Sequence, residues 1–173
     1  YEKLFGEGEV TIFSAPGRSE IGGNHTDHQH GMVLAASINL DAIAISSPLT
    51  EEKVEIVSGN YPMVTIDLKK LDTVKSEEGT TKALIKGVIA ELKDRGYKIG
   101  GFKAYITSDV LIGAGLSSSA AFETIVGTII SGFYNNMEIS PVVIAQVGQY
   151  AENVYFGKPC GLMDQMACSV GSM

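Results

Sequence analysis

At residues 113–121 the sequence reads Gly-Ala-Gly-Leu-Ser-Ser-Ser-Ala-Ala, and the pattern of the chain changes there. Before it, residues 102–107 alternate apolar and polar side chains, which is typical of a half-buried strand. After it, apolar residues continue as a helix pattern to about residue 130. Small residues ahead of a helix let backbone N–H groups approach a phosphate, and the helix start adds partial positive charge. The stretch therefore predicts a phosphate loop, and a buried helix capped by serine is the alternative.

Strand and helix patterns lie on both sides of this stretch. Residues 80–95 carry apolar side chains four positions apart, which predicts an amphipathic helix. Ser140-Pro141 is a typical start for another helix, which we expect to run to about residue 155. Strand patterns occupy residues 10–13, 32–36, 38–46, 54–57 and 64–66. At 173 residues and without a flexible linker, the chain has the size of one domain containing both helices and strands.

Composition excludes several classes of function. The net charge of −7 disfavours a nucleic-acid or anionic-membrane surface, because both need a basic face on the protein. No apolar run reaches the roughly 18–20 residues of a membrane helix and no signal peptide is visible, so we expect a soluble cytoplasmic protein. The two cysteines are too few for a disulfide scaffold. Glycine is over-represented, with 20 residues, which directs attention to sites built from backbone.

All three histidines of the chain lie in one polar segment, residues 17–31. One interpretation is a zinc site made of His25, Asp27, His28 and His30, but the spacing is not that of helical ligands and no known zinc motif accompanies it. The second is a sugar site, because carboxylate, amide and imidazole groups bind vicinal hydroxyls. A solvated polar loop is the third.

Two acids stand in otherwise apolar surroundings near the end of the chain. Glu152 and Asp164 would lose hydration there unless a cation or a catalytic role compensates. Asp164 is a candidate general base or a partner of Arg18, and an ordinary helix N-cap is the alternative. Glu152 is a candidate magnesium ligand, since Mg²⁺ prefers oxygen donors, and a surface acid at a helix end is the alternative.

Taken in order, three segments resemble the GHMP small-molecule kinases, and within them the galactokinases. The segments are Gly17-Arg18 to Gly23-Asn24-His25-Thr26-Asp27, then Gly115-Leu116-Ser117-Ser118-Ser119-Ala120-Ala121, then Cys160-Gly161-Leu162-Met163-Asp164-Gln165. The resemblance covers nearly the whole chain. It implies an α+β fold, the GHMP kinase N-terminal domain of the ribosomal protein S5 domain 2-like type, with a mixed sheet and helices packed on one face. Within residues 1–173 it implies a sugar-binding loop at 15–31, a phosphate loop at 113–121 and a catalytic-aspartate segment at 159–165.

The resemblance also implies an activity, the ATP-dependent phosphorylation of the anomeric C1 hydroxyl of galactose or a closely related sugar. Asp164 would act on the attacking hydroxyl, as a base or as an orienting charge, and Arg18 would pair with it. The residues implied to bind the sugar are Asn24, His25, Asp27 and Gly161. Those implied to bind the phosphates of ATP are Gly113, Gly115, Leu116, Ser117, Ser118 and Ser119. Ser119 and Glu152 would hold Mg²⁺.

Three positions depart from the usual galactokinase pattern. Asn24 stands where glutamate is typical, Glu20 where asparagine is typical, and His28 where tyrosine is typical. The loss of the glutamate leaves the C6 group of the sugar open, so a galacturonate kinase is one alternative. A catalytically inactive protein that senses sugar or ATP on the same fold is another, although Arg18, Asp164 and the serine run are intact. A kinase of a non-sugar alcohol is disfavoured by the His-Thr-Asp cluster.

The family's C-terminal domain has no counterpart in these residues. We therefore expect the chain to be the N-terminal domain of a larger kinase, inactive when alone.

Overall fold

The computed structural model describes residues 1–110 and 114–171. In chain order the elements are α1 (Glu2–Phe5), β1 (Thr11–Gly22), η1 (Thr26–Gln29), β2 (Leu34–Leu49), β3 (Lys53–Ser58), β4 (Val64–Asp67), η2 (Lys75–Glu77), α2 (Thr81–Asp94), β5 (Gly101–Ser108), α3 (Ser118–Tyr134), α4 (Pro141–Tyr150), η3 (Ala151–Phe156) and α5 (Met163–Val170). The elements η1 and η2 are 3-10 turns, whereas η3 is a π-helical turn.

The five strands form one mixed sheet in the order β1-β2-β5-β3-β4. Neighbouring strands are antiparallel except for β3 and β5, which are parallel. Ala42 and Ala44 of β2 are at most 2% exposed, while Ile43 between them is 38% exposed. This alternation is that of a sheet with one covered face, and it agrees with the predicted mixed sheet.

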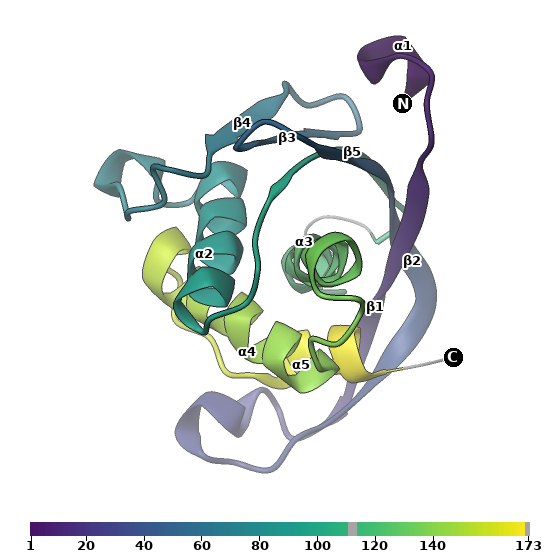
Figure 1. Ribbon diagram of the computed structural model, residues 1–173. Helices are drawn as coiled ribbons and strands as arrows, with labels where there is room; N and C mark the ends of the chain where they lie inside the picture. The colour runs from purple at the N-terminus through teal and green to yellow at the C-terminus, as the bar shows by residue number, and fades with distance from the viewer. Residues whose placement is uncertain (111–113, 172–173) are drawn as a thin grey trace.

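The helices α2, α3 and α5 pack on the covered face, α4 packs against these three helices, and α3 lies in the middle of the group (Figure 1). The side chains at the centre of α3 are apolar and at most 1% exposed, as expected for a helix surrounded by protein: Ile125, Val126, Ile129 and Ile130. In the described ranges, no helix combines the length and apolar character needed to cross a bilayer.

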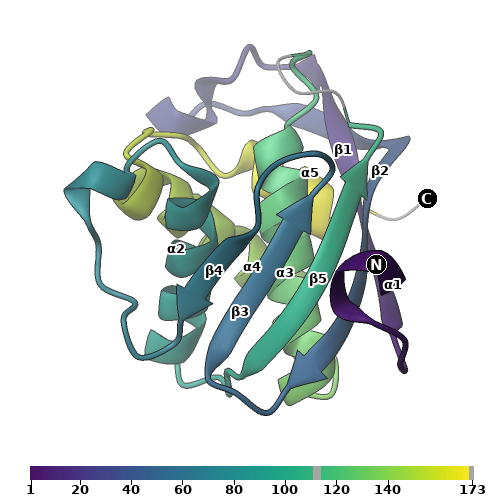
Figure 2. The ribbon, with the colours of Figure 1, turned by 90° about the horizontal axis from the view of Figure 1, so that it is seen from above.

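The short helix α1 lies on the other face of the sheet, in front of the strands in Figure 2. There the Tyr1 and Ser47 hydroxyls are 2.6 Å apart, and the Lys103 ammonium donates to the Phe5 carbonyl at 3.1 Å. These contacts cover only one end of β2 and β5, so most of this face stays open.

The first strand is longer than its sequence pattern predicted. The prediction placed a strand at residues 10–13 and a loop at 15–31, but β1 continues to Gly22, so the first half of that loop is strand. Proline and glycine concealed the strand, since Pro16 removes one backbone donor. Because β1 is an edge strand, it tolerates the proline, and its register with β2 shifts between Pro16 and Arg18.

The helix predicted at residues 140–155 is also not continuous. It ends as an α-helix at Tyr150 and continues as the π-helical turn η3, which holds Glu152 at 3% exposure. Apolar spacing alone does not distinguish the two kinds of turn, because both bury side chains three to five positions apart. Single π-helical turns inside helices are frequent at functional sites. The alternative of a surface acid at Glu152 is therefore wrong.

Candidate active site

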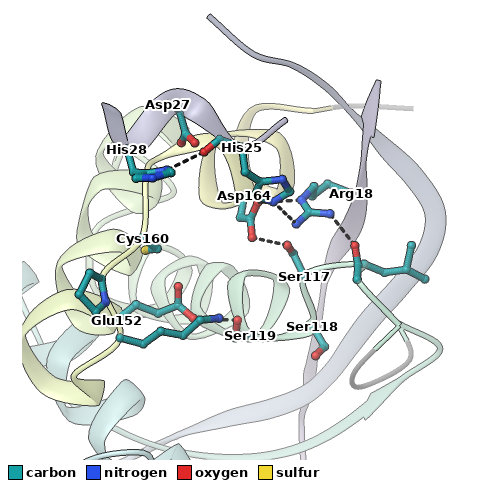
Figure 3. Close-up of a pocket in the computed structure, with 15 residues that line it drawn as sticks. Arg18, His25, Asp27, His28, Ser117, Ser118, Ser119, Glu152, Cys160 and Asp164 are labelled. Atoms are coloured by element: carbon teal, nitrogen blue, oxygen red, sulfur yellow. Dashed lines mark hydrogen bonds and ion pairs between the residues drawn. The ribbon is translucent and has the colours of Figure 1, made fainter. Parts of the chain in front are cut away.

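A cavity of about 390 Å³ forms where the end of β1, the start of α3 and the segment leading into α5 meet. All three segments of the resemblance contribute to its lining, together with four residues outside them. The lining residues are Arg18, His25, Asp27, His28, Gly115, Leu116, Ser117, Ser118, Ser119, Glu152, Lys158, Pro159, Cys160, Gly161 and Asp164. Figure 3 shows Arg18, His25, Ser117 and Asp164 converging in one part of this cavity.

Arg18 lies on β1, is 5% exposed and binds each of the other segments. Its Nε donates to Asp164 Oδ1 at 2.7 Å, and its Nη1 donates to the Gly115 carbonyl at 2.6 Å. Its Nη2 is 3.1 Å from His25 Nε2. A buried guanidinium needs this many partners, because an uncompensated buried charge is strongly destabilising. Arg18 therefore fixes the phosphate-loop segment and α5 relative to β1.

Asp164 lies in the first turn of α5, where the helix N-terminus favours a negative charge. Ser117 donates to its Oδ2 at 2.5 Å, while Arg18 holds the other oxygen. Burial works against ionisation of Asp164, but the hydrogen bonds from Arg18 and Ser117 outweigh it and hold its pKa below the usual value. The carboxylate is therefore ionised at neutral pH, and the alternative of a plain N-cap is wrong because Leu162 occupies that position.

Gly17 explains how β1 and the phosphate-loop segment come so close. A Cβ at this position would lie 2.9 Å from the Leu116 carbonyl oxygen and 2.9 Å from Val110 Cγ1. The next residue, Arg18, donates its backbone N–H to that same carbonyl at 3.2 Å. A side chain at Gly17 would force the two segments apart, so the glycine is required for the contact.

His25 is held by Glu20, a contact that the sequence did not predict. The backbone N–H of His25 donates to Glu20 Oε1 at 2.8 Å, and His25 Nδ1 contacts the other oxygen. The hydrogen bond from this backbone N–H is the main cause that lowers the pKa of Glu20. His25 has a left-handed backbone with φ of 53°, which turns the chain back toward Arg18. The one signal for this contact in the sequence was that Glu20 stands where galactokinases usually have asparagine.

Asp27 joins the polar segment to the start of α5. Its Oδ2 accepts from the Met163 backbone N–H at 2.8 Å, which satisfies one of the unpaired donors at that helix end. A Cβ at Gly161 would lie 1.9 Å from the same oxygen, so any side chain there would have to displace the Asp27 carboxylate. Asp27 Oδ2 is therefore engaged inside the protein, and its remaining acceptor capacity faces the cavity.

The remaining predicted residues of the polar segment are placed less centrally. His28 lines the cavity, with its Nδ1 2.6 Å from the His25 carbonyl. Asn24, with φ of 54°, is exposed and does not line the cavity as described. Over residues 1–110 and 114–171, no three His, Cys, Asp or Glu side chains cluster closely enough to hold a metal ion, so the zinc interpretation lacks a ligand set.

The start of α3 forms the opposite wall of the cavity. Ser117 has φ of 56° and does not cap the helix, since its hydroxyl donates to Asp164 instead. Ser118 and Ser119 occupy the first turn, where backbone N–H groups of a helix lack intrahelical partners. This leaves a place suited to an anion. Gly113, also predicted to bind phosphate, lies outside the described residues.

Ser119 and Glu152 present two oxygen atoms to each other at the edge of the cavity. The Ser119 hydroxyl donates to Glu152 Oε1 at 2.9 Å, as Figure 3 shows. A hydroxyl and a carboxylate are donors that fit Mg²⁺, which keeps several of its waters when it binds to protein. The donor set therefore fits the ion that the resemblance implied.

Behind Glu152 lies a second buried carboxylate, on Glu123 of α3. Gln165 Nε2 donates to both carboxylates, at 3.2 Å each. Burial, followed by the charge of Glu152, raises the pKa of Glu123 well above its usual value. Sequence reasoning missed Glu123 and Gln165, although an isolated acid inside an apolar helix was a visible signal.

Known families match both ends of the chain. A family model described as "GHMP kinases N terminal domain" matches residues 83–172, and one described as "Galactokinase galactose-binding signature" matches residues 1–48. The galactokinase of Clostridium tetani is 34% identical over 98% of this chain, and that of Pyrococcus furiosus is 38% identical over 94% of it. The chain spans 43% and 44% of the length of these two relatives.

Solved structures show the same fold. The crystal structure of Lactococcus lactis galactokinase complexed with galactose matches with a TM-score of 0.90 and 32% identity, over 99% of this chain and 45% of that one. The mevalonate kinase of Methanococcus jannaschii matches with a TM-score of 0.77 at 21% identity, over 95% of this chain and 52% of that one. These matches confirm the predicted fold class.

Proposed function

This chain belongs to the GHMP kinase family, and from that premise we propose that the protein transfers a phosphoryl group from ATP to the C1 hydroxyl of galactose or a closely related sugar. The observation that carries the proposal is the ionised Asp164 between Arg18 and Ser117, in a cavity with sugar-type ligands on one side and a helix N-terminus on the other. The similarity to galactokinases over nearly the whole chain supports it.

In this proposal Asp164 orients the attacking hydroxyl. A carboxylate with a lowered pKa is a weak base, so its first role is to accept a hydrogen bond from the sugar hydroxyl and direct a lone pair at the phosphorus atom. As the bond from the sugar oxygen to the γ-phosphorus forms, the bond from that phosphorus to the bridging β-phosphate oxygen breaks and ADP leaves, while the hydroxyl proton moves to an oxygen of Asp164. Arg18 keeps Asp164 ionised in the free enzyme and stabilises the negative charge that develops nearby.

The sugar would lie against the polar segment. His25 and Asp27 line the cavity. Asp27 engages only its Oδ2 among the described residues, whereas both ring nitrogens of His25 are engaged by Glu20 and Arg18, so a sugar hydroxyl would have to replace one of these contacts. Gly161 brings backbone close to the same place without a side chain. Asn24 would act on the C6 group of the sugar only from the rim, because it lies outside the cavity lining.

The phosphates would lie at the start of α3, against the first-turn N–H groups and the hydroxyls of Ser118 and Ser119. Ser119 and Glu152 would hold Mg²⁺, which supplies charge neutralisation for the phosphates when bound. We place the protein in the cytoplasm, because ATP is the proposed co-substrate and because the two cysteines form no disulfide, as is usual for proteins in that compartment. Because the chain spans under half of its relatives, we expect further sequence to complete the nucleotide site.

The decisive experiment is an ATP-coupled activity screen of the full-length protein. The acceptors are galactose, galacturonate, N-acetylgalactosamine and arabinose, and phosphorus NMR of the product identifies the phosphorylated position. We expect a sugar 1-phosphate from galactose or from one of its close relatives. Binding of sugar and ATP without turnover would instead support the sensor alternative, and absence of sugar binding would overturn the proposal.

A further inference from the structure

The cavity contains a positive charge that the mechanism so far does not use. Its described lining has three carboxylates, on Asp27, Glu152 and Asp164, but only two permanently cationic side chains, on Arg18 and Lys158. A triphosphate adds several negative charges to this set. The cations of the cavity therefore decide how well such a ligand is held.

Arg18 is largely committed to contacts within the protein. Each of its three guanidinium nitrogens already has a partner, on Asp164, Gly115 and His25, at 2.6 to 3.1 Å, which leaves two of its five N–H donors. Its side chain is only 6% exposed. Turning it toward a ligand would leave the partly buried Asp164 carboxylate without this donor, which is costly.

Lys158 is in the opposite situation. It is exposed and lines the same cavity as Ser119 and Glu152. Within the part of the chain that the structure describes, its ammonium has no carboxylate within 4.0 Å and donates no hydrogen bond. An ammonium carries three donors and a compact charge, which suits phosphate oxygens.

The backbone around Lys158 is held firmly, so the side chain starts from a fixed position. Its N–H donates to the Glu152 carbonyl at 3.0 Å, and Gly157 before it closes the π-helical turn with φ of 79°. After it, the Cys160 N–H donates to Asn153 Oδ1 at 2.7 Å. The same turn thus positions both the proposed magnesium ligand and the lysine.

We propose that Lys158 binds the terminal phosphates of the nucleoside triphosphate, in the cavity that it lines together with the start of α3. The inference rests on the proposed function and adds a phosphate-binding side chain outside the serine run. We assign Lys158 to the nucleotide because its backbone is bonded to that of Glu152, the proposed magnesium ligand beside the phosphates.

The test uses the full-length protein with Lys158→Met, the charge-conserving Lys158→Arg, and the matched control Lys98→Met, an exposed lysine outside the cavity. Calorimetry measures the dissociation constants of AMP, ADP and a non-hydrolysable ATP analogue with magnesium, and of galactose. We expect Lys158→Met to weaken the ATP analogue about tenfold or more, to leave AMP and galactose unchanged, and Lys158→Arg to retain most of the affinity.

Other outcomes overturn the inference. Unchanged affinity for the ATP analogue in Lys158→Met, an equal loss with AMP, or an equal loss in Lys98→Met would each show that Lys158 does not bind the terminal phosphates. Unchanged galactose affinity shows that the variant is folded. If the wild-type protein binds no triphosphate at all, the proposed function fails and this inference fails with it. If the wild-type protein binds the triphosphate and Lys158→Met binds it equally well, only this inference fails.

Discussion

Replacing Gly161 with alanine tests how the cavity is built. The added Cβ would lie 1.9 Å from Asp27 Oδ2, whereas ordinary contact begins at 3.4 Å. The carboxylate must therefore retreat by about 1.5 Å, and its 2.8 Å hydrogen bond from the Met163 N–H breaks. We expect the loss of a hydrogen bond to a charged group to reduce the free energy of unfolding by about 1.5–3 kcal/mol.

The same displacement should affect the sugar more than the nucleotide. A misplacement of about 1 Å can lower the rate of an enzyme by about 100-fold, and Asp27 is a proposed sugar ligand. We expect Gly161→Ala to lower kcat/KM for the sugar by about that factor while the KM for ATP changes little. Steady-state kinetics and urea unfolding of the full-length protein measure both effects. Gly8→Ala is the control, because a Cβ there meets nothing within 4 Å.

A double-mutant cycle identifies the cause. With Asp27→Ala the clash disappears, so Gly161→Ala should then cost almost no unfolding free energy. If the cost is the same with and without Asp27, or if Gly161→Ala keeps the sugar affinity of the wild type, the contact between these two residues is not what excludes a side chain.

We expect Asp164→Asn to lower turnover by about a thousandfold or more while sugar binding is kept, and near-normal turnover would remove its catalytic role. Glu152→Ala should raise the magnesium concentration needed for half-maximal rate about tenfold, and an unchanged titration would exclude it as a ligand. Asn24→Glu should lower the use of galacturonate relative to galactose, whereas identical specificity would place Asn24 outside the sugar site. The raised pKa of Glu123 means that above its ordinary pKa of 4.5 the folded chain holds a proton that the unfolded chain has lost, so its contribution to stability falls as the pH rises. Glu123→Gln should therefore raise the unfolding free energy more at pH 7 than at pH 4, as measured by urea denaturation, and an equal change at both pH values would contradict the assignment.

Local sequence patterns predicted most of the helices and strands, and the motifs predicted most of the residues that line the cavity. The amphipathic helix expected at residues 80–95 is α2, and the expected contact between Arg18 and Asp164 is confirmed at 2.7 Å, although its role in catalysis stays a prediction. Contacts between distant segments were harder to predict. Nothing in the serine run indicates that Ser117 turns away from the phosphate side to donate to Asp164, since that depends on where α5 docks.

Local backbone detail was equally hidden. The π-helical turn that buries Glu152 and positions Lys158 has the same apolar spacing as an α-helix, so sequence periodicity did not reveal it. The hydrogen bond from the His25 backbone N–H to Glu20 depends on a left-handed backbone at His25, and residues other than glycine seldom adopt that conformation. Both features require the three-dimensional path of the chain.

The ion pair between Arg18 and Asp164 joins the first strand to the last helix, across 146 positions of sequence. During synthesis on a ribosome, Arg18 emerges long before its partner exists, and a buried guanidinium without a carboxylate opposes folding. The polar end of β1 can therefore close only after α5 has docked. Formation of the Arg18–Asp164 pair is in this way a late event that follows the docking of α5, and a chain stalled before residue 164 would present a sheet edge at β1 without this pair.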